Sequence, residues 1–183
     1  MLKIFAKAAL LAIALVAVTN ADAQTRRQPA QRETTPATPP PSVDKRDSVV
    51  VTPGGPFNGK PYWLALAQCG GAYFKLNVLY TDVAVHARIK PDPRATAEYT
   101  RKLTDAIRIG TIYFDGTERF LMTDRGIERV DAVLTYDPQS RAEGDRLKTV
   151  EAAEAAVRVC PALYEACQKA FPKACSEQLP PTS

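Results

Sequence analysis

Residues 61–91 read PYWLALAQCGGAYFKLNVLYTDVAVHARIKP, and this stretch decides the fold. Its apolar side chains recur at alternating spacings of four and three residues, which places them on one face of an α-helix. Pro91 and Pro93 end the pattern, because the residue before a proline avoids the helical region. We therefore expect one long helix from Tyr62, whose buried face is formed by Tyr62, Leu66, Cys69, Tyr73, Leu76, Tyr80, Val83 and Ala87.

Two adjacent glycines, Gly70 and Gly71, lie inside this helix beside Cys69. Each glycine in a helix interior costs about 1 kcal/mol relative to alanine, so the pair should serve a purpose. A missing Cβ lets a neighbouring backbone come close. We expect another segment of the chain to pack against the helix at this point.

A second helical stripe runs from Tyr99 to Phe120. The chain could continue as one long helix or break near residues 123–126. Gly126 is a typical helix-end residue, and a new stripe begins at Ile127. We therefore favour two helices over one.

Two further helix signals follow. Asp137 before Pro138 is typical of a helix start, with Asp as the N-cap and Pro at the first helical position. The last stripe covers residues 147–171, and Pro161 either kinks it or restarts it. The chain contains no convincing alternating strand pattern. We predict an all-α fold, a disulfide-stapled up-down bundle of three to four helices over residues 61–175.

The N-terminal residues have the three parts of a secretory signal peptide. Lys3 and Lys7 supply positive charge, residues 8–18 form an apolar run, and Ala21-Asp22-Ala23 matches the A-x-A cleavage pattern. We expect a cut after Ala23 that removes residues 1–23, and hence a periplasmic or secreted protein. The alternative is an uncleaved N-terminal anchor, although the run is about half of the roughly 20 residues that a membrane-spanning helix needs. No integral membrane span is expected after cleavage.

Residues 24–60 contain seven prolines and few large apolar side chains. Such a segment buries too little apolar surface to offset its ordering entropy, so we predict a disordered, proline-rich basic linker. Its proline-rich part should be stretched toward polyproline II. Residues 49–51, three valines, could pair as a short strand that the turn residues 53–56 would end. The tail, residues 176–183, is also expected to be disordered.

The charge of the chain is divided unevenly. The linker carries 6 Lys/Arg and 3 Asp/Glu, whereas residues 61–183 carry 16 of each kind. A nucleic-acid-binding domain needs a basic face on its folded part, so no nucleic acid is expected as a partner. The basic linker could contact an anionic surface such as an outer membrane or a wall polymer, but a solvated tether is the simpler interpretation.

Four cysteines in an oxidising compartment predict two disulfides. Cys160 and Cys167 are about 10.5 Å apart along one helix, beyond the roughly 7 Å between Cα atoms that a disulfide allows. Cys175 follows the end of that helix and can return to Cys167, but its short link cannot reach Cys160. We therefore predict the pairs Cys167–Cys175 and Cys69–Cys160, the second joining the first helix to the last.

The single histidine, His86, lies late in the first helix, one residue off the apolar stripe. As a catalytic base it would need a nucleophile and an orienting acid, and the sequence designates neither, so we expect a structural role. One histidine and four cysteines could form a zinc site only by using nearly every candidate at once. No Walker loop, dinucleotide fingerprint, H-E-x-x-H or EF-hand motif occurs. We predict no catalytic, cofactor-binding or metal-binding residues and classify the chain as a non-enzyme.

Two other groups of side chains have both a functional and a structural interpretation. Tyrosines in register could line a ligand groove, but they more often belong to a core with hydroxyls at its rim. Acidic residues that share helical faces could bind a cation, but interleaved arginines favour a salt-bridged, solvated face. The tyrosines are Tyr62, Tyr73, Tyr80, Tyr99 and Tyr113; the acidic residues are Asp115, Glu118, Asp124, Glu128 and Asp131, with Arg119, Arg125 and Arg129 between them.

The pattern W-x5-C-G-G-x-Y resembles the helix opening of small secreted bacterial helical proteins of unassigned function. Here it is formed by Trp63, Cys69, Gly70, Gly71 and Tyr73. This resemblance covers residues 63–73 alone and implies no activity.

Cys69 with the L-N-x-x-Y pattern of Leu76, Asn77 and Tyr80 is similar to a helix of the lysozyme-inhibitor family. The chain lacks that family's preceding Asp and its later Q-R-A-W segment. The resemblance implies an inhibitor or accessory subunit of an envelope hydrolase. Our main expectation is an exported envelope protein with a non-catalytic binding or structural role, with an envelope protein as its partner. A third alternative is an enzyme with an unrecognised acid/base site around His86 or paired carboxylates.

Overall fold

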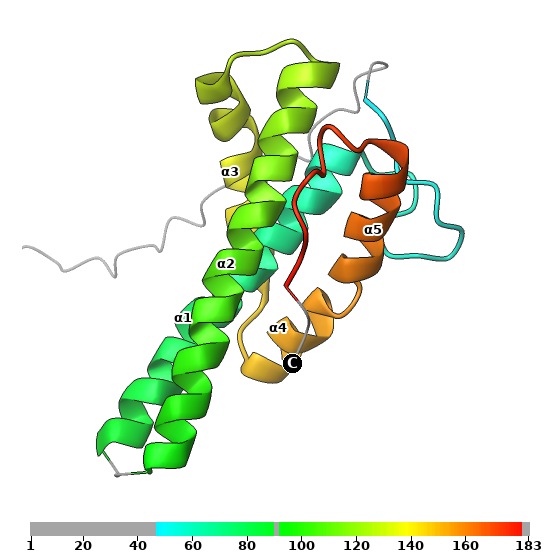
Figure 1. The fold of residues 1–183 in the computed structure, drawn as a ribbon. Coiled ribbons are helices and arrows are strands. Elements are labelled where there is room, and N and C mark those ends of the chain that lie inside the picture. Colours follow the sequence, from blue (N-terminus) through cyan, green and yellow to red (C-terminus); the bar gives the residue numbers. More distant parts are fainter. Residues whose placement is uncertain (1–46, 90–91, 181–183) are drawn as a thin grey trace, which may run out of the picture. The chain divides into compact units, whose positions relative to one another are not determined.

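The computed structural model describes residues 47–89 and 92–180, and these residues contain five helices and no β-strand (Figure 1). The all-α prediction is confirmed. The predicted signal peptide and the first part of the predicted linker, up to residue 46, lie outside the described residues. The helices are α1 (Tyr62–Ile89), α2 (Pro93–Asp124), α3 (Arg129–Arg146), α4 (Val150–Val157) and α5 (Cys160–Ala170).

Helices α1 and α2 form a long antiparallel hairpin (Figure 1). Asp92 caps α2, because its side chain accepts hydrogen bonds from the backbone N–H groups of Arg94 and Ala95 at 3.1 and 3.0 Å. Helix α2 ends at Asp124, and Gly126 follows with a positive φ of 65°. The predicted break between two helices is therefore confirmed.

The expectation that Asp137 and Pro138 begin a helix is wrong. Both lie in the middle of α3, which begins at Arg129. Pro138 cannot donate a hydrogen bond to the carbonyl four residues earlier, but that residue, Leu134, is on the exposed side of α3 where water can reach it. On the opposite side Ala132 and Tyr136 are buried, and this packing outweighs the local start signal.

The last stripe of apolar residues is divided between α4 and α5. Thr149 caps α4 by accepting a hydrogen bond from the N–H of Ala152 at 3.2 Å. Pro161 lies in the first turn of α5, where its missing N–H has no helical partner to lose. Of the two possibilities that the sequence left open, Pro161 therefore restarts the helix.

Both disulfides have the predicted pairing. Cys69 of α1 is bonded to Cys160 at the start of α5, with 5.8 Å between their Cα atoms. Cys167 of α5 is bonded to Cys175, with a Cα–Cα distance of 5.9 Å. The first bond joins α1 to α5, and the second holds the segment that follows α5 close to that helix.

Residues 47–60, which we expected to be disordered, fold against the helices instead. Val50 is only 2% exposed and belongs to the core, and Val49 forms an isolated antiparallel bridge with Pro61. The carboxylate of Asp47 accepts two hydrogen bonds from Arg125, at 2.9 and 2.7 Å. The low apolar content of residues 24–60 as a whole conceals the one valine of the three, Val50, that packs into the core.

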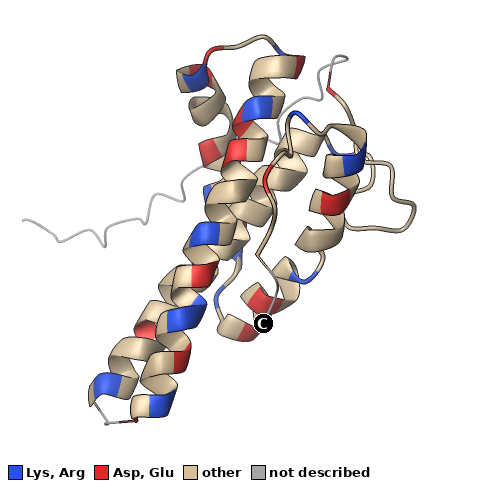
Figure 2. Cartoon of the chain, viewed as in Figure 1, with Lys and Arg blue, Asp and Glu red and all other residues tan. Residues whose placement is uncertain are grey.

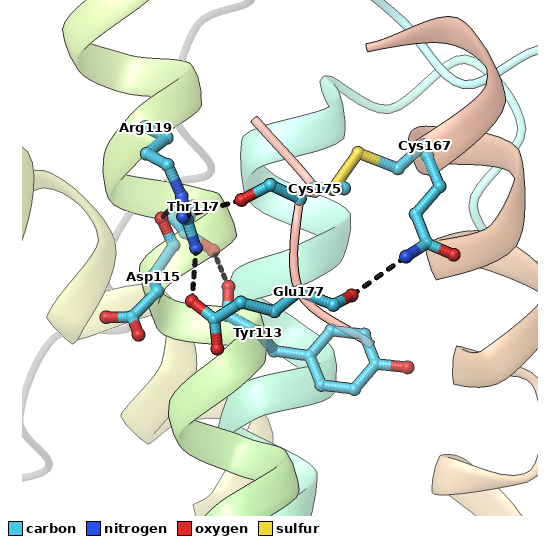
Figure 3. The surroundings of a disulfide bond; sticks show 9 residues. Tyr113, Asp115, Thr117, Arg119, Cys167, Cys175 and Glu177 are labelled. Carbon is cyan, nitrogen blue, oxygen red and sulfur yellow. Dashed lines mark hydrogen bonds and ion pairs between the residues drawn. A yellow bond between two sulfur atoms is a disulfide. The ribbon is translucent and has the colours of Figure 1, made fainter. Parts of the chain in front are cut away.

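The expectation of a disordered tail is also wrong for its described part, residues 176–180. Arg119 of α2 donates hydrogen bonds to the hydroxyl of Ser176 at 3.0 Å and to the carboxylate of Glu177 at 2.8 Å (Figure 3). The side-chain amide of Gln168 donates to the backbone carbonyl of Glu177 at 2.8 Å. Leu179 packs against the core. The Cys167–Cys175 disulfide brings the tail to the position where these contacts form.

Within residues 47–89 and 92–180, no helix is both long enough and apolar enough to cross a membrane.

Candidate functional site

Helices α1 and α3 touch through their backbones at Gly71. A Cβ atom added to Gly71 would overlap the backbone carbonyl of Ser140, and one added to Gly144 would lie 3.5 Å from the carbonyl oxygen of Gly71. The neighbouring Gly70 faces the ring of Phe114 instead, which would be 2.5 Å from an added Cβ. The expectation that a second backbone packs against the glycine pair is confirmed, and the segment that does so is α3.

A groove of about 530 Å³ lies beside this crossing. Phe74 and Val78 form much of its apolar surface, and they are 44% and 50% exposed. Half-exposed large apolar side chains that share one concave surface are typical of binding sites. The groove is lined by Gly71, Phe74, Lys75 and Val78 of α1, Phe114 of α2, and Tyr136, Asp137, Ser140, Arg141, Gly144 and Asp145 of α3.

Three aromatic rings from three helices form a connected floor. The rings of Phe74 and Phe114 lie 5.3 Å apart between centroids, and Phe114 stacks on Tyr136 at 5.3 Å with 20° between the planes. The hydroxyl of Tyr136 donates a hydrogen bond to Glu118 at 3.1 Å. Burial, followed by the negative charge of Glu118, raises the pKa of Tyr136, so its hydroxyl stays a donor. The floor is therefore fixed by stacking and by this hydrogen bond.

The rim of the groove is charged on both sides. Arg141 donates to Asp137 at 2.8 Å, four residues earlier on α3. Lys75 on α1 and Asp145 on α3 have no ion-pair partner among the described residues. Lys75 and Asp145 thus present one positive and one negative charge, beside an apolar floor, to a ligand in the groove.

His86 lies outside this groove. It is exposed on α1, and its Nδ1 is 2.7 Å from the backbone carbonyl oxygen of Asp82. The described residues contain no group of three or more His, Cys, Asp or Glu side chains placed to hold a metal ion. Among residues 47–89 and 92–180, no acidic side chain or nucleophile lies within hydrogen-bonding distance of His86.

The five tyrosines singled out in the sequence belong to the core rather than to the groove. Tyr73 stacks on Tyr113 with 5.5 Å between ring centroids, and Tyr80 packs on the half-buried Tyr99 at 5.7 Å. Tyr62 stacks on Phe120 at 5.5 Å. Burial raises the pKa of Tyr73 to about 12. The core interpretation of these side chains is the one that the structure supports.

The charged residues between 115 and 131 pair mainly with other segments. Arg129 forms an ion pair with Glu118 at 2.7 Å, as a salt-bridged face requires. Arg119 and Arg125 instead reach the carboxylates of Glu177 and Asp47, which lie outside this run. The expected salt bridges are present, but the partners of these two arginines lie outside the run, and the two pairs hold the two ends of the described chain against α2. Figure 2 shows basic and acidic residues interspersed along the α1–α2 hairpin.

The motif residues behind the two resemblances have structural roles. Leu76 is buried, the side-chain amide of Asn77 donates to the carbonyl of Leu103 at 3.2 Å, and the hydroxyl of Tyr80 donates to Glu154 at 2.8 Å. Trp63 is buried beneath the guanidinium of Arg125, whose carbon lies 4.9 Å from the ring centroid. Packing, hydrogen bonds and the cation–π contact within the fold account for these positions.

Comparisons with protein-family models, curated proteins and solved structures found no match for this chain. Function therefore has to be inferred from the groove.

The sequence analysis did not identify the groove residues Phe74 and Val78, although a signal was present. They continue as Val85 and Ile89 into a second apolar stripe on α1, beside the stripe that forms the core. A helix with two apolar stripes has one more than it needs to pack against a single neighbour. That surplus could have indicated a second contact surface.

Proposed function

We propose that this chain is an exported protein of the cell envelope with a non-catalytic binding role. In this proposal the groove between α1 and α3 receives an apolar segment of a partner protein. The observation that carries it is the half-exposed pair Phe74 and Val78, on an apolar floor beside Lys75 and Asp145, which form no ion pair with another residue of the described part of the chain. Aromatic anchors surrounded by a few placed polar groups account for most of the affinity of protein interfaces.

The rigidity of the groove supports a binding role. The backbone contact between Gly71 and Ser140 fixes the spacing of the two helices, and the stacked rings of Phe114 and Tyr136 fix the floor. A site that is already formed loses little conformational entropy when a ligand enters it. The same contacts therefore favour binding without rearrangement.

Two features support export. The first is the signal-peptide pattern of residues 1–23. The second is the pair of disulfides, which persist in oxidising compartments such as the bacterial periplasm.

The test is site-specific photo-crosslinking in living cells. The photoreactive amino acid p-benzoylphenylalanine replaces Val78 in the groove, and in a matched control it replaces Val159, an exposed valine between α4 and α5. We expect a protein adduct at Val78 that is absent at Val159. Phe74→Ala in the Val78 probe should reduce the adduct about tenfold, as loss of an aromatic anchor does. Equal adducts at both positions, or an adduct that is insensitive to Phe74→Ala, would refute the proposal.

A further inference from the structure

The apolar surface of the groove continues along the α1–α2 hairpin. Val85 and Ile89 of α1 and Ile107 of α2 are exposed large apolar residues. The first two belong to the end of the hairpin nearest the connection between its helices, and this end extends away from the other helices (Figure 1). The described part of the chain therefore leaves these three side chains uncovered.

These side chains share one side of the hairpin with the groove. On α1, Val85 follows Val78 by seven residues, and on α2, Ile107 precedes Phe114 by seven. Seven residues make about two helical turns, so residues at this spacing lie one above the other. The groove and the surface beyond it are continuous. We call this surface the hairpin face, and it is formed by Phe74, Val78, Val85, Ile89, Ile107 and Phe114.

The part of the hairpin face that α2 supplies is uncharged. Thr100 precedes Ile107 by a further seven residues, and its hydroxyl donates to the backbone carbonyl of Thr96 at 2.7 Å, so its proton is used within the helix. A partner can therefore pack here without burying a charge. The charged residues of α2 between positions 96 and 114 fall on its other sides by their helical spacing, and they are Glu98, Arg101, Lys102, Asp105 and Arg108.

The spacing of residues on the α1 part of the face is that of helices packed side by side. Phe74, Val78, Thr81 and Val85 follow one another by four, three and four residues. This repeat, which averages 3.5 residues, is the a/d pattern through which helices interlock at a small crossing angle. The occupant that this pattern favours is a helix.

Helix α3 shows how the fold itself covers this side of the hairpin. The ring of Tyr136 stacks on Phe114, and the backbone at Ser140 meets Gly71. Both contacts are made by a helix. Beyond α3 the same side is open, so a further helix would continue the packing that α3 begins.

The size of the hairpin face argues against a second copy of this chain as the occupant. From Phe74 to Ile89 it extends about 22 Å, and two helices side by side are about 20 Å wide, which gives roughly 450 Å². Stable complexes between folded proteins bury about 800 Å² on each partner. A single helix of about four turns matches the face in length.

The outer edge of α1 carries two charges that restrict the partner further. Lys75 and Asp82 are seven residues apart, and neither forms an ion pair within residues 47–89 and 92–180. Charges at the edge of a helix–helix contact select partners with opposite charges. A matching helix carries an acidic residue opposite Lys75 and a basic residue opposite Asp82, two turns apart.

We propose that the partner segment is an amphipathic α-helix that lies along the hairpin face from the groove to Ile89. This inference rests on the proposed function, because it identifies the segment that the groove receives. The apolar side of this helix packs on the hairpin face, and its acidic and basic residues meet Lys75 and Asp82. Recognition of a helix through anchors at such spacings is a general mode of peptide binding.

The first test extends the crosslinking in cells from position 78 to position 89. p-Benzoylphenylalanine replaces Ile89 and, in a matched control, the exposed His86, which points to another side of α1. We expect the same partner protein in the adducts at 78 and 89, and none of it at 86. Peptide mapping gives the two crosslinked sites in the partner. Positions 78 and 89 are about 16 Å apart along α1, which corresponds to about eleven residues of a helix but about five of an extended chain.

The second test places a charge on the hairpin face. V85D adds a carboxylate two turns from Val78, and H86D adds the same group on a neighbouring side of the helix. V85D should reduce the adduct at position 78 about tenfold, because a helix packed on the face would bury an unpaired charge. H86D should leave the yield unchanged. Both positions are exposed, and circular dichroism checks that both variants remain folded.

Three outcomes would overturn the inference and leave the groove as a binding site. They are an adduct at position 78 without one at 89, partner sites about five residues apart, and equal yields from V85D and H86D. A partner that proves to be a second copy of this chain would overturn it as well. The absence of any protein adduct at position 78 would instead refute the proposed function, and the inference with it.

Discussion

Two faces of α1 differ in how completely they are covered. The face with Cys69, Tyr73 and Tyr80 is buried and held by a disulfide, by a tyrosine stack and by a hydrogen bond to Glu154. The face with Phe74 and Val78 meets α3 at Gly71 and is half open beyond that crossing. One helix thus provides both the centre of the core and the floor of a groove. Substitutions on the first face should change stability, and those on the second should mainly change binding.

The disulfides give the largest expected effect. In the loop-entropy model, removing the Cys69–Cys160 bond as C69A/C160A costs about 4 to 5 kcal/mol, because the bond closes a long loop. Removing Cys167–Cys175 as C167A/C175A costs about 2 to 3 kcal/mol for its much shorter loop. Urea unfolding of both variants measures the difference. Equal losses would show that strain or packing, not loop closure, determines the contribution of each bond.

Tyr73 and Phe74 are neighbours in sequence that lie about 100° apart around α1, one on the buried face and one on the groove side, so they test the comparison directly. Tyr73→Ala removes a buried ring and should cost about 3 to 5 kcal/mol. Phe74→Ala removes a half-exposed ring and should cost about 1 kcal/mol. Denaturant unfolding of the two variants, read by circular dichroism, gives both values. If Phe74→Ala destabilises the protein as much as Tyr73→Ala does, the claim that the two faces of α1 differ in their contribution to stability is wrong.

Alkaline pH should lower the stability of the fold through its buried tyrosines, of which Tyr73 is one. Burial raises the pKa of Tyr73 from the usual 10 to about 12, so the folded state keeps a proton that the unfolded state has lost. The contribution of Tyr73 to the free energy of unfolding is fully present below pH 10. As the pH rises toward 12, this contribution falls by on the order of 2 kcal/mol. Thermal melts across this window, combined with tyrosinate absorbance, check the prediction. Tyr73→Phe is the control, because it removes one titrating hydroxyl and should make the profile less steep by the share of this group. Burial also raises the pKa of Tyr80, Tyr113 and Tyr136, so the remaining slope belongs to them.

The contact between α1 and α3 can be tested with two glycines. Gly71→Ala forces a Cβ into the backbone of Ser140 and should cost about 1 to 3 kcal/mol. Gly144→Ala meets ordinary contact distances and gains helix propensity, so it should be neutral or stabilising by up to about 1 kcal/mol. Unfolding midpoints distinguish the two. A Gly71→Ala protein as stable as the original would mean that the helices separate without loss, and that the groove is not rigid.

His86→Ala should have the smallest effect. The side chain is exposed, and within the described residues its polar contact is to a backbone carbonyl in its own helix, so stability should change by less than about 0.5 kcal/mol. The same variant tests the alternative of an enzyme. Loss of a measurable activity of the protein on this substitution would contradict the non-catalytic role.

The sequence was most informative where one periodic signal controlled a whole element. The stripe from Tyr62 predicted α1. The helical rise excluded a Cys160–Cys167 bond and the short link after the helix excluded Cys160–Cys175, so both pairings followed. Prediction from the sequence failed where tertiary packing opposed a local signal, as at Pro138 inside α3. It also failed at Val50, a core residue in a segment whose average composition is that of a linker.

The groove could be anticipated only in part. Gly70 and Gly71 indicated that a backbone would pack there, and the structure places α3 at Gly71. Nothing in the local sequence states that α3 would cross there and leave Phe74 and Val78 half open. That exposure depends on the angle and length of a helix some seventy residues away, which periodicity does not encode.

The Cys69–Cys160 bond makes a closed ring of the chain that it encloses, which includes all of α2, α3 and α4. A protease that cuts any connection within this ring opens it without releasing a fragment, because both new ends remain attached through the disulfide. The connections between helices are the parts of a fold that proteases reach most easily. A molecule that has been cut once in this way would keep all of its parts together.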